Sequence, residues 1–85
     1  MEKNKTARTM SMPGAAFVMA HGYHLPQIEL NRGRFDFCWP DPDGKVDRLL
    51  SEYRDGASIV ARDYYRSLQD IRFAVNRAKA DEGVR

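Results

Sequence analysis

Three side chains in the sequence are of types that bind zinc: His21, His24 and Cys38. A structural zinc site needs four ligands, usually in two close pairs, and the chain holds no further cysteine or histidine. Gly22 also interrupts any helix between the two histidines, so they need not share a face. We therefore interpret both histidines as polar residues at a helix end, and we expect no bound metal.

The acidic segment Asp41-Pro42-Asp43-Gly44, with Glu52 further on, resembles a calcium-binding loop only in outline. Lys45 stands where such a loop needs another oxygen ligand, and Val46 stands where its sharp turn needs glycine. Capping of the helix that follows is the better explanation of these aspartates.

Nucleophilic catalysis by Cys38 would require a histidine and an orienting group beside it. Because its neighbours in a predicted strand are aromatic on the other face, we expect Cys38 to point away from them and to be accessible. One cysteine and two histidines occur together by chance in many proteins, and the carboxylates of Asp47 and Glu52 fit a solvated helix face. The chain also lacks a Gly-rich phosphate loop. We expect a non-enzymatic protein with no cofactor and no small-molecule substrate.

Residues of the types that mediate contacts gather in one helix, which the spacing predicts over Ile59–Lys79. Five residues recur at helical period and form one apolar stripe: Tyr64, Leu68, Ile71, Val75 and Ala78. Five others fall on nearly the opposite side, at about 100° per residue: Arg62, Arg66, Gln69, Phe73 and Arg77. The outer side is therefore predicted to be basic, with one aromatic at its centre.

A phenylalanine that faces water opposite a complete core stripe indicates a contact surface. Our first hypothesis is contact with a protein, self-association as a homodimer included, through four residues: Arg62, Arg66, Phe73 and Arg77. The alternative is direct nucleic-acid binding by arginines of this helix and of a predicted hairpin tip: Arg32, Arg34, Arg62, Arg66 and Arg77. Asp63 and Asp70 lie on the same helix, so an ordinary surface of ion pairs is the third interpretation.

A hairpin and two shorter helices should position the long helix. Ser11 is a good cap for a buried helix that starts at Met12 and stops at Gly22. Alternating apolar residues predict strands over 27–30 and 35–39, joined by a turn at Asn31-Arg32-Gly33. Two strands alone are barely stable in water, so helices must cover the apolar face of this hairpin.

Asp41-Pro42 predicts the start of the next helix, which Asp55-Gly56 should end. Its apolar face is made of Val46, Leu49, Leu50 and Tyr53. Ala57–Val60 is then either an extended link or a third short strand. The expected fold is a small α+β domain over residues 11–80, in the order α-β-β-α-α.

The two ends of the chain show little pattern. Met1–Met10 is predicted to be a flexible, basic tail, and residues 81–85 are expected to fray. The 85 residues form one domain, and the formal charge of +2 does not by itself indicate nucleic-acid binding. A single cysteine fits a reducing compartment, and no apolar run matches a signal peptide or a membrane span. We expect a cytoplasmic location.

The pattern of small and aromatic residues resembles a family of small uncharacterised bacterial and phage domains, a domain of unknown function. The residues that support the resemblance are Ala15-Ala16-Phe17 with Gly22, Phe35-x-Phe37, Leu49-x-x-x-Tyr53-x-x-Gly56, and Tyr64 before a basic helix end. The chain departs from this pattern at Pro13-Gly14, where the family has a better helix start. The resemblance implies a bacterial or mobile-element origin, and it implies no activity, cofactor or catalytic residue. Our own hypothesis is a non-enzymatic accessory module of a bacterial or phage protein–nucleic acid system.

Overall fold

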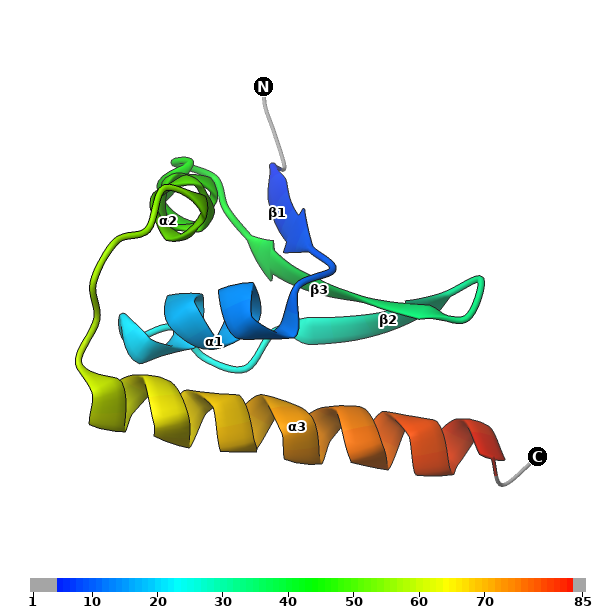
Figure 1. Ribbon diagram of the computed structural model, residues 1–85. Coiled ribbons are helices and arrows are strands. Elements are labelled where there is room, and N and C mark those ends of the chain that lie inside the picture. The colour runs from blue at the N-terminus through cyan, green and yellow to red at the C-terminus, as the bar shows by residue number, and fades with distance from the viewer. Residues whose placement is uncertain (1–4, 84–85) are drawn as a thin grey trace.

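A short buried helix, α1 (Met12–Ala20), lies at the centre of the molecule (Figure 1). The hydroxyl of Ser11 accepts a hydrogen bond from the N–H of Gly14 at 2.9 Å, which caps the first turn. Residues 14–18 are all buried, so α1 is covered on every side rather than along one stripe. The computed structural model describes residues 5–83, apart from the side chains of residues 82 and 83.

A three-stranded antiparallel sheet covers one side of α1. Its strands are β1 (Thr6–Thr9), β2 (Gln27–Asn31) and β3 (Arg34–Pro40), in the order β1-β3-β2. In the central strand, Phe37 pairs with Ile28 of β2, and Trp39 pairs with Ala7 of β1. Side chains of paired residues lie on the same face, so these four belong to the core that includes α1.

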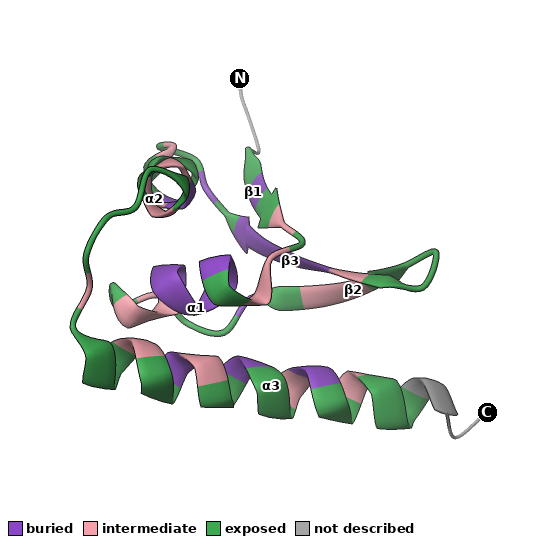
Figure 2. Ribbon diagram, in the orientation of Figure 1, coloured by how far each residue is buried: buried purple, intermediate pink, exposed green. Residues whose placement is uncertain are grey.

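Two further helices complete the domain. Helix α2 (Lys45–Arg54) packs on α1 and on β1 through Val46 and Leu50, both of which are buried. Helix α3 (Ala61–Gly83) packs chiefly along α1, on the side away from the sheet (Figure 1). Figure 2 shows the result: α1 and β3 are largely buried, whereas α3 is buried only along the stripe that faces α1.

The predicted fold class is confirmed: the protein is a small α+β domain whose hairpin and helices follow the expected order. The hairpin turn depends on backbone with positive φ, 56° at Arg32 and 81° at Gly33. None of the helices within residues 5–83 is both long enough and apolar enough to cross a membrane.

The prediction of a flexible tail over residues 1–10 is wrong for the part that the structure describes. Thr6–Thr9 forms β1, an edge strand along β3, whereas residues 1–4 lie outside the described part. Only Ala7 of this strand is buried, so its alternation is too weak to recognise in the sequence. The third strand is therefore β1, and Ala57–Val60 is a link without strand structure.

Two helix boundaries also differ from the prediction. Helix α2 begins at Lys45, four residues after Asp41, with Gly44 in the left-handed conformation at its cap. The Asp41 carboxylate still caps it, because its oxygens accept the N–H groups of Val46 at 2.9 Å and Asp47 at 3.0 Å. Helix α3 begins at Ala61 and continues to Gly83, through residues that were expected to fray; residues 84 and 85 are outside the described part.

Candidate contact surface on helix α3

Helix α3 has the orientation that its apolar spacing predicts. Ile71 and Val75 are buried against α1, and Tyr64, Leu68 and Ala78 are half-buried on the same side. Ser67 is buried there as well, although its polar side chain gave no such signal in the sequence. The outer side carries the predicted contact residues in exposed positions: Arg62, Arg66, Gln69, Phe73 and Arg77.

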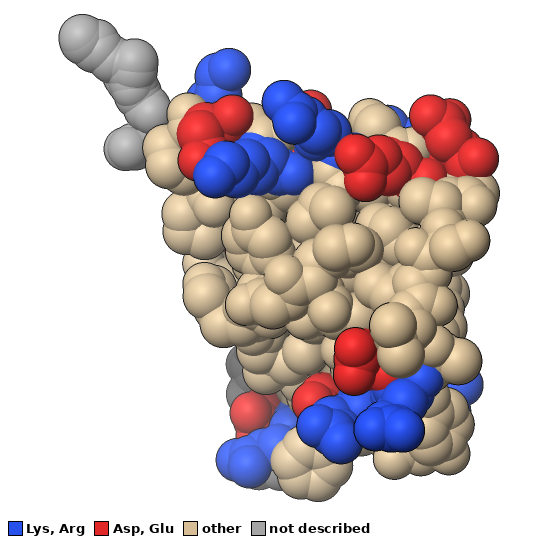
Figure 3. All heavy atoms as spheres, turned by 90° about the vertical axis from the view of Figure 1, so that its left-hand side faces the viewer, with Lys and Arg blue, Asp and Glu red and all other residues tan. Residues whose placement is uncertain are grey.

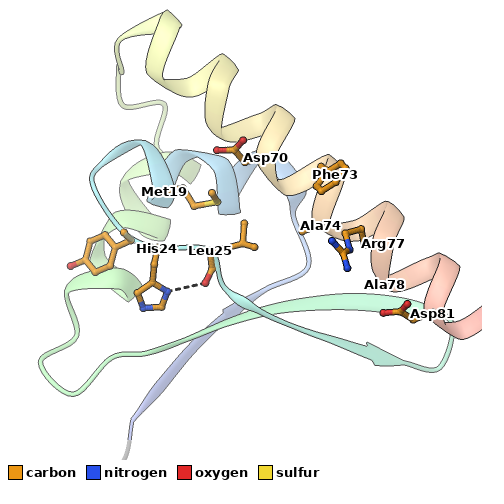
Figure 4. Close-up of a pocket in the computed structure, with 10 residues that line it drawn as sticks. Met19, His24, Leu25, Asp70, Phe73, Ala74, Arg77, Ala78 and Asp81 are labelled. Carbon is orange, nitrogen blue, oxygen red and sulfur yellow. Dashed lines mark hydrogen bonds between the residues drawn. The ribbon is translucent and has the colours of Figure 1, made fainter.

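Phe73 is the most exposed large apolar side chain in the described part of the chain, at 65% of its full surface. It lies at the edge of a groove of about 810 Å³ between α3 and the loop that follows α1 (Figure 4). Met19 and Leu25 form one wall, and Ala74 and Ala78 belong to the other. Leu25 is itself 44% exposed, so apolar surface continues across the groove from Phe73. This combination makes the groove a candidate contact site.

The loop wall of the groove is held in place by three hydrogen bonds. The indole N–H of Trp39 donates to the carbonyl oxygen of His24 at 2.9 Å, and this ties the loop to the sheet. Nδ1 of His24 donates to the carbonyl oxygen of Leu25 at 2.8 Å, and Nδ1 of His21 donates to that of Phe17 at 3.1 Å. The loop wall of the groove is therefore held in place by contacts within the monomer.

The charge around Phe73 is mixed rather than simply basic. Arg77 lines the groove together with two aspartates, Asp70 and Asp81. Figure 3 shows blue and red side chains intermingled along the lower edge of the molecule, where α3 lies. Among the described residues, no ion pair joins Arg66, Asp70 or Arg77 to another side chain. Arg66, Asp70 and Arg77 are all exposed to solvent.

The arginines of the hairpin tip do not join this surface. Arg32 and Arg34 are exposed, but Arg34 lines a different groove, of about 250 Å³, together with Phe35 and Val75. The tip lies toward the C-terminal end of α3, whereas Arg62 is in the first turn of that helix (Figure 1). The five arginines proposed for nucleic-acid binding are thus divided between two regions of the surface.

Cys38 is not accessible, contrary to our expectation. It lies on the outer face of the sheet, but only 4% of its surface is exposed. Arg8 lies beside it on that face, at 3.2 Å from carboxylate oxygens of both Glu29 and Asp36. Burial raises the pKa of the Cys38 thiol, which disfavours the reactive thiolate.

Neither a histidine beside Cys38 nor a metal-binding cluster is found in the described part of the chain. The depression that contains Cys38 has no histidine among its lining residues. No three His, Cys, Asp or Glu side chains within the described residues lie close enough together to hold a metal ion. The groove beside Phe73 is therefore the strongest candidate for a functional surface.

Comparisons of the chain with protein-family models, with curated proteins and with solved structures give no match. The resemblance to small bacterial and phage domains stays a prediction.

Proposed function

We propose that this protein is a non-enzymatic contact module, which binds a protein partner or a second copy of itself through the outer side of α3. Its contact residues are Arg62, Arg66, Phe73 and Arg77, which we call the α3 contact face. The observation that supports this most strongly is Phe73, which is 65% exposed beside a preformed groove with an apolar wall.

The composition of this face is typical of protein interfaces. Aromatic residues and arginine are enriched in interfaces, and a buried aromatic anchor commonly supplies much of the binding energy. Phe73 can supply the anchor, and the arginines around it can pair with acidic groups of a partner at the rim.

Direct binding of nucleic acid is the second candidate, since Arg62, Arg66 and Arg77 are all exposed. Two features disfavour it. Asp70 and Asp81 line the same groove as Arg77, so a phosphate there would meet carboxylates as well as guanidinium groups. The tip arginines also lie apart from the groove. They are at the turn that follows β2, whereas the groove borders the loop that precedes β2. A bacterial or phage origin is proposed from the resemblance alone, and the setting in a protein–nucleic acid system is a further part of the proposal.

Site-specific photo-crosslinking tests the proposed contact. A benzoylphenylalanine introduced at position 73 should form an adduct with a protein in the source cell after irradiation. The matched control places the same group at Arg54, which is exposed at the end of α2, and should form none. Absence of any adduct at position 73 would contradict the proposal.

A titration with labelled nucleic acid tests the second candidate. Anisotropy of a DNA duplex and of a single-stranded RNA would be followed at two salt concentrations. Direct binding requires affinity that falls steeply with salt, because each phosphate contact releases a counterion. If the triple replacement of Arg62, Arg66 and Arg77 by alanine abolished such binding while Phe73→Ala left it intact, nucleic acid would replace protein as the partner.

A further inference from the structure

The side of α3 that borders the groove carries charges in a regular order. Arg66, Asp70, Phe73, Arg77 and Asp81 are spaced four, three, four and four residues apart. This spacing places them along one side of the helix. Read along the chain, the order is positive, negative, apolar, positive, negative.

This order is complementary to its own reverse. Asp70 and Arg77 lie equally far, along the helix, from a point between Phe73 and Ala74, and so do Arg66 and Asp81. If a second α3 runs antiparallel about a two-fold axis through that point, Asp70 is level with Arg77 of the second copy. Arg66 is likewise level with Asp81 of the second copy. A parallel pair in register would instead bring each charge level with its own kind.

The apolar residues near the same axis are complementary as well. Phe73 and Ala74 are neighbours at its centre, so in such a pair the large phenyl ring of each copy would be level with the methyl group of Ala74 of the other. Leu25 and Met19 border the same groove and can cover the ring from the loop side. A two-fold contact of this kind is isologous: one patch serves both copies and the assembly closes as a dimer.

We infer that the occupant of the groove is a second copy of this chain, bound through antiparallel α3 helices about a two-fold axis between Phe73 and Ala74. The inference rests on the proposed function, for which it names the partner. Binding of an unrelated protein would require this side of α3 to be complementary to that protein. It would not require the charges to be symmetric about the point between Phe73 and Ala74. A polyanion would be repelled by Asp70 and Asp81.

Charge reversal with rescue tests both the partner and the register. The variants are Asp70→Arg, Arg77→Asp and the double variant that carries both changes. In either single variant like charges face each other, and we expect dimerisation to weaken by about tenfold or more. The double variant restores opposite charges at the same positions, so its dissociation constant should return to within about threefold of the parent value.

Sedimentation equilibrium from about 1 µM to about 1 mM gives the dissociation constant of each variant. The parent mass should rise with concentration from that of a 9.8 kDa monomer toward twice that value. The matched control is Arg48→Asp, which reverses an exposed charge on α2 and should leave dimerisation unchanged. Circular dichroism at low concentration checks that all variants remain folded.

Three results would overturn the inference: a parent protein that stays monomeric at about 1 mM, single variants that dimerise like the parent, or a double variant that is not rescued. The proposed function is judged separately by the adduct at position 73. An adduct with a different protein, together with a monomeric parent, would leave the contact module standing and remove self-pairing. A monomeric parent with no adduct would remove both.

Discussion

Helices α1 and α3 pack against each other, yet they use their residues in opposite ways. Helix α1 has nine residues, and five consecutive ones are buried. Helix α3 has 23 residues, of which Ser67, Ile71 and Val75 are the buried ones among those described. The short helix is the part of the core that the other elements surround. The long helix packs on it along one stripe, and the rest of the surface of the long helix is exposed.

The difference separates side chains that stabilise the fold from those that the proposed contact would use. Helix α1 contacts α2, α3 and β1, so truncation of one of its buried side chains should lower the stability of the whole domain. A side chain on the outer side of α3 contacts little inside the monomer, so its loss should affect association and not folding. The variants below test this division, in order of decreasing effect on the free energy of unfolding.

Phe17→Ala in α1 should have the largest effect. Phe17 is only 1% exposed, and its ring lies 4.7 Å from that of His21 and 5.5 Å from that of Tyr53, measured between centroids. Truncation of a buried phenylalanine costs about 3–5 kcal/mol, a large share of the stability of so small a domain. Urea denaturation measures the loss, with Phe17→Leu as the milder control. A loss below about 1 kcal/mol would show that α1 is not central to the core.

Ile71→Ala on the packed stripe of α3 should have the next largest effect. Ile71 is fully buried, but α3 packs chiefly on α1, so the helix can shift to fill part of the cavity. We expect a loss of about 2–3 kcal/mol in urea denaturation, less than for Phe17→Ala. Ile71→Val, which removes one methylene group, should cost about 1 kcal/mol. A larger loss than at Phe17 would reverse the proposed order of the two helices.

For Tyr64, at the start of the same stripe, we expect a smaller effect on the free energy of unfolding, and one that depends on pH. Burial raises the pKa of its hydroxyl, and the neighbouring Tyr53 raises it further. The folded protein therefore holds this proton more tightly than the unfolded chain, so the stabilisation is complete below about pH 10, the pKa of a free tyrosine. It is lost as the pH rises through the higher pKa of the folded state.

The Tm should accordingly fall more between about pH 9 and about pH 11 in the parent protein than in Tyr64→Phe, which keeps the ring and removes the proton. Thermal unfolding followed by circular dichroism measures both. Equal falls in the two proteins would mean that the fold does not raise the pKa of Tyr64 above that of a free tyrosine.

The orientation of α3 could be predicted from sequence because one helix contains all the information that it needs. The spacing of Tyr64, Leu68, Ile71 and Val75 defines the inner side, and Phe73 falls on the outer side as a consequence. The hairpin could be predicted equally well, since its turn residues and its alternation of apolar and polar residues are local in the sequence. Features of this kind depend on residues that are close together in the chain.

The features that the sequence did not reveal depend on residues far apart in the chain. Cys38 is buried because Arg8, which arrives on β1, lies beside it and contacts Glu29 and Asp36. Strand β1 itself contributes one small buried side chain, Ala7, and so leaves almost no hydrophobic signal. The groove beside Phe73 requires Leu25 to lie across from α3, and no local pattern reports that proximity.

Phe73→Ala should have the smallest effect on the monomer and the clearest effect on association. Because most of the ring is in water, its loss should change the free energy of unfolding by less than about 0.5 kcal/mol at low concentration. If the chain pairs through α3, the parent Tm rises with protein concentration, because dimerisation stabilises the folded state by mass action. Phe73→Ala should remove that rise.

Tyr65→Ala, which truncates another exposed aromatic of α3 away from the charged stripe, should preserve it. Thermal scans of the three proteins at low and high concentration therefore separate a residue that is exposed for contact from one that is merely exposed. If Phe73→Ala and Tyr65→Ala behaved alike, the outer side of α3 would be ordinary surface, and the contrast with α1 would concern stability alone.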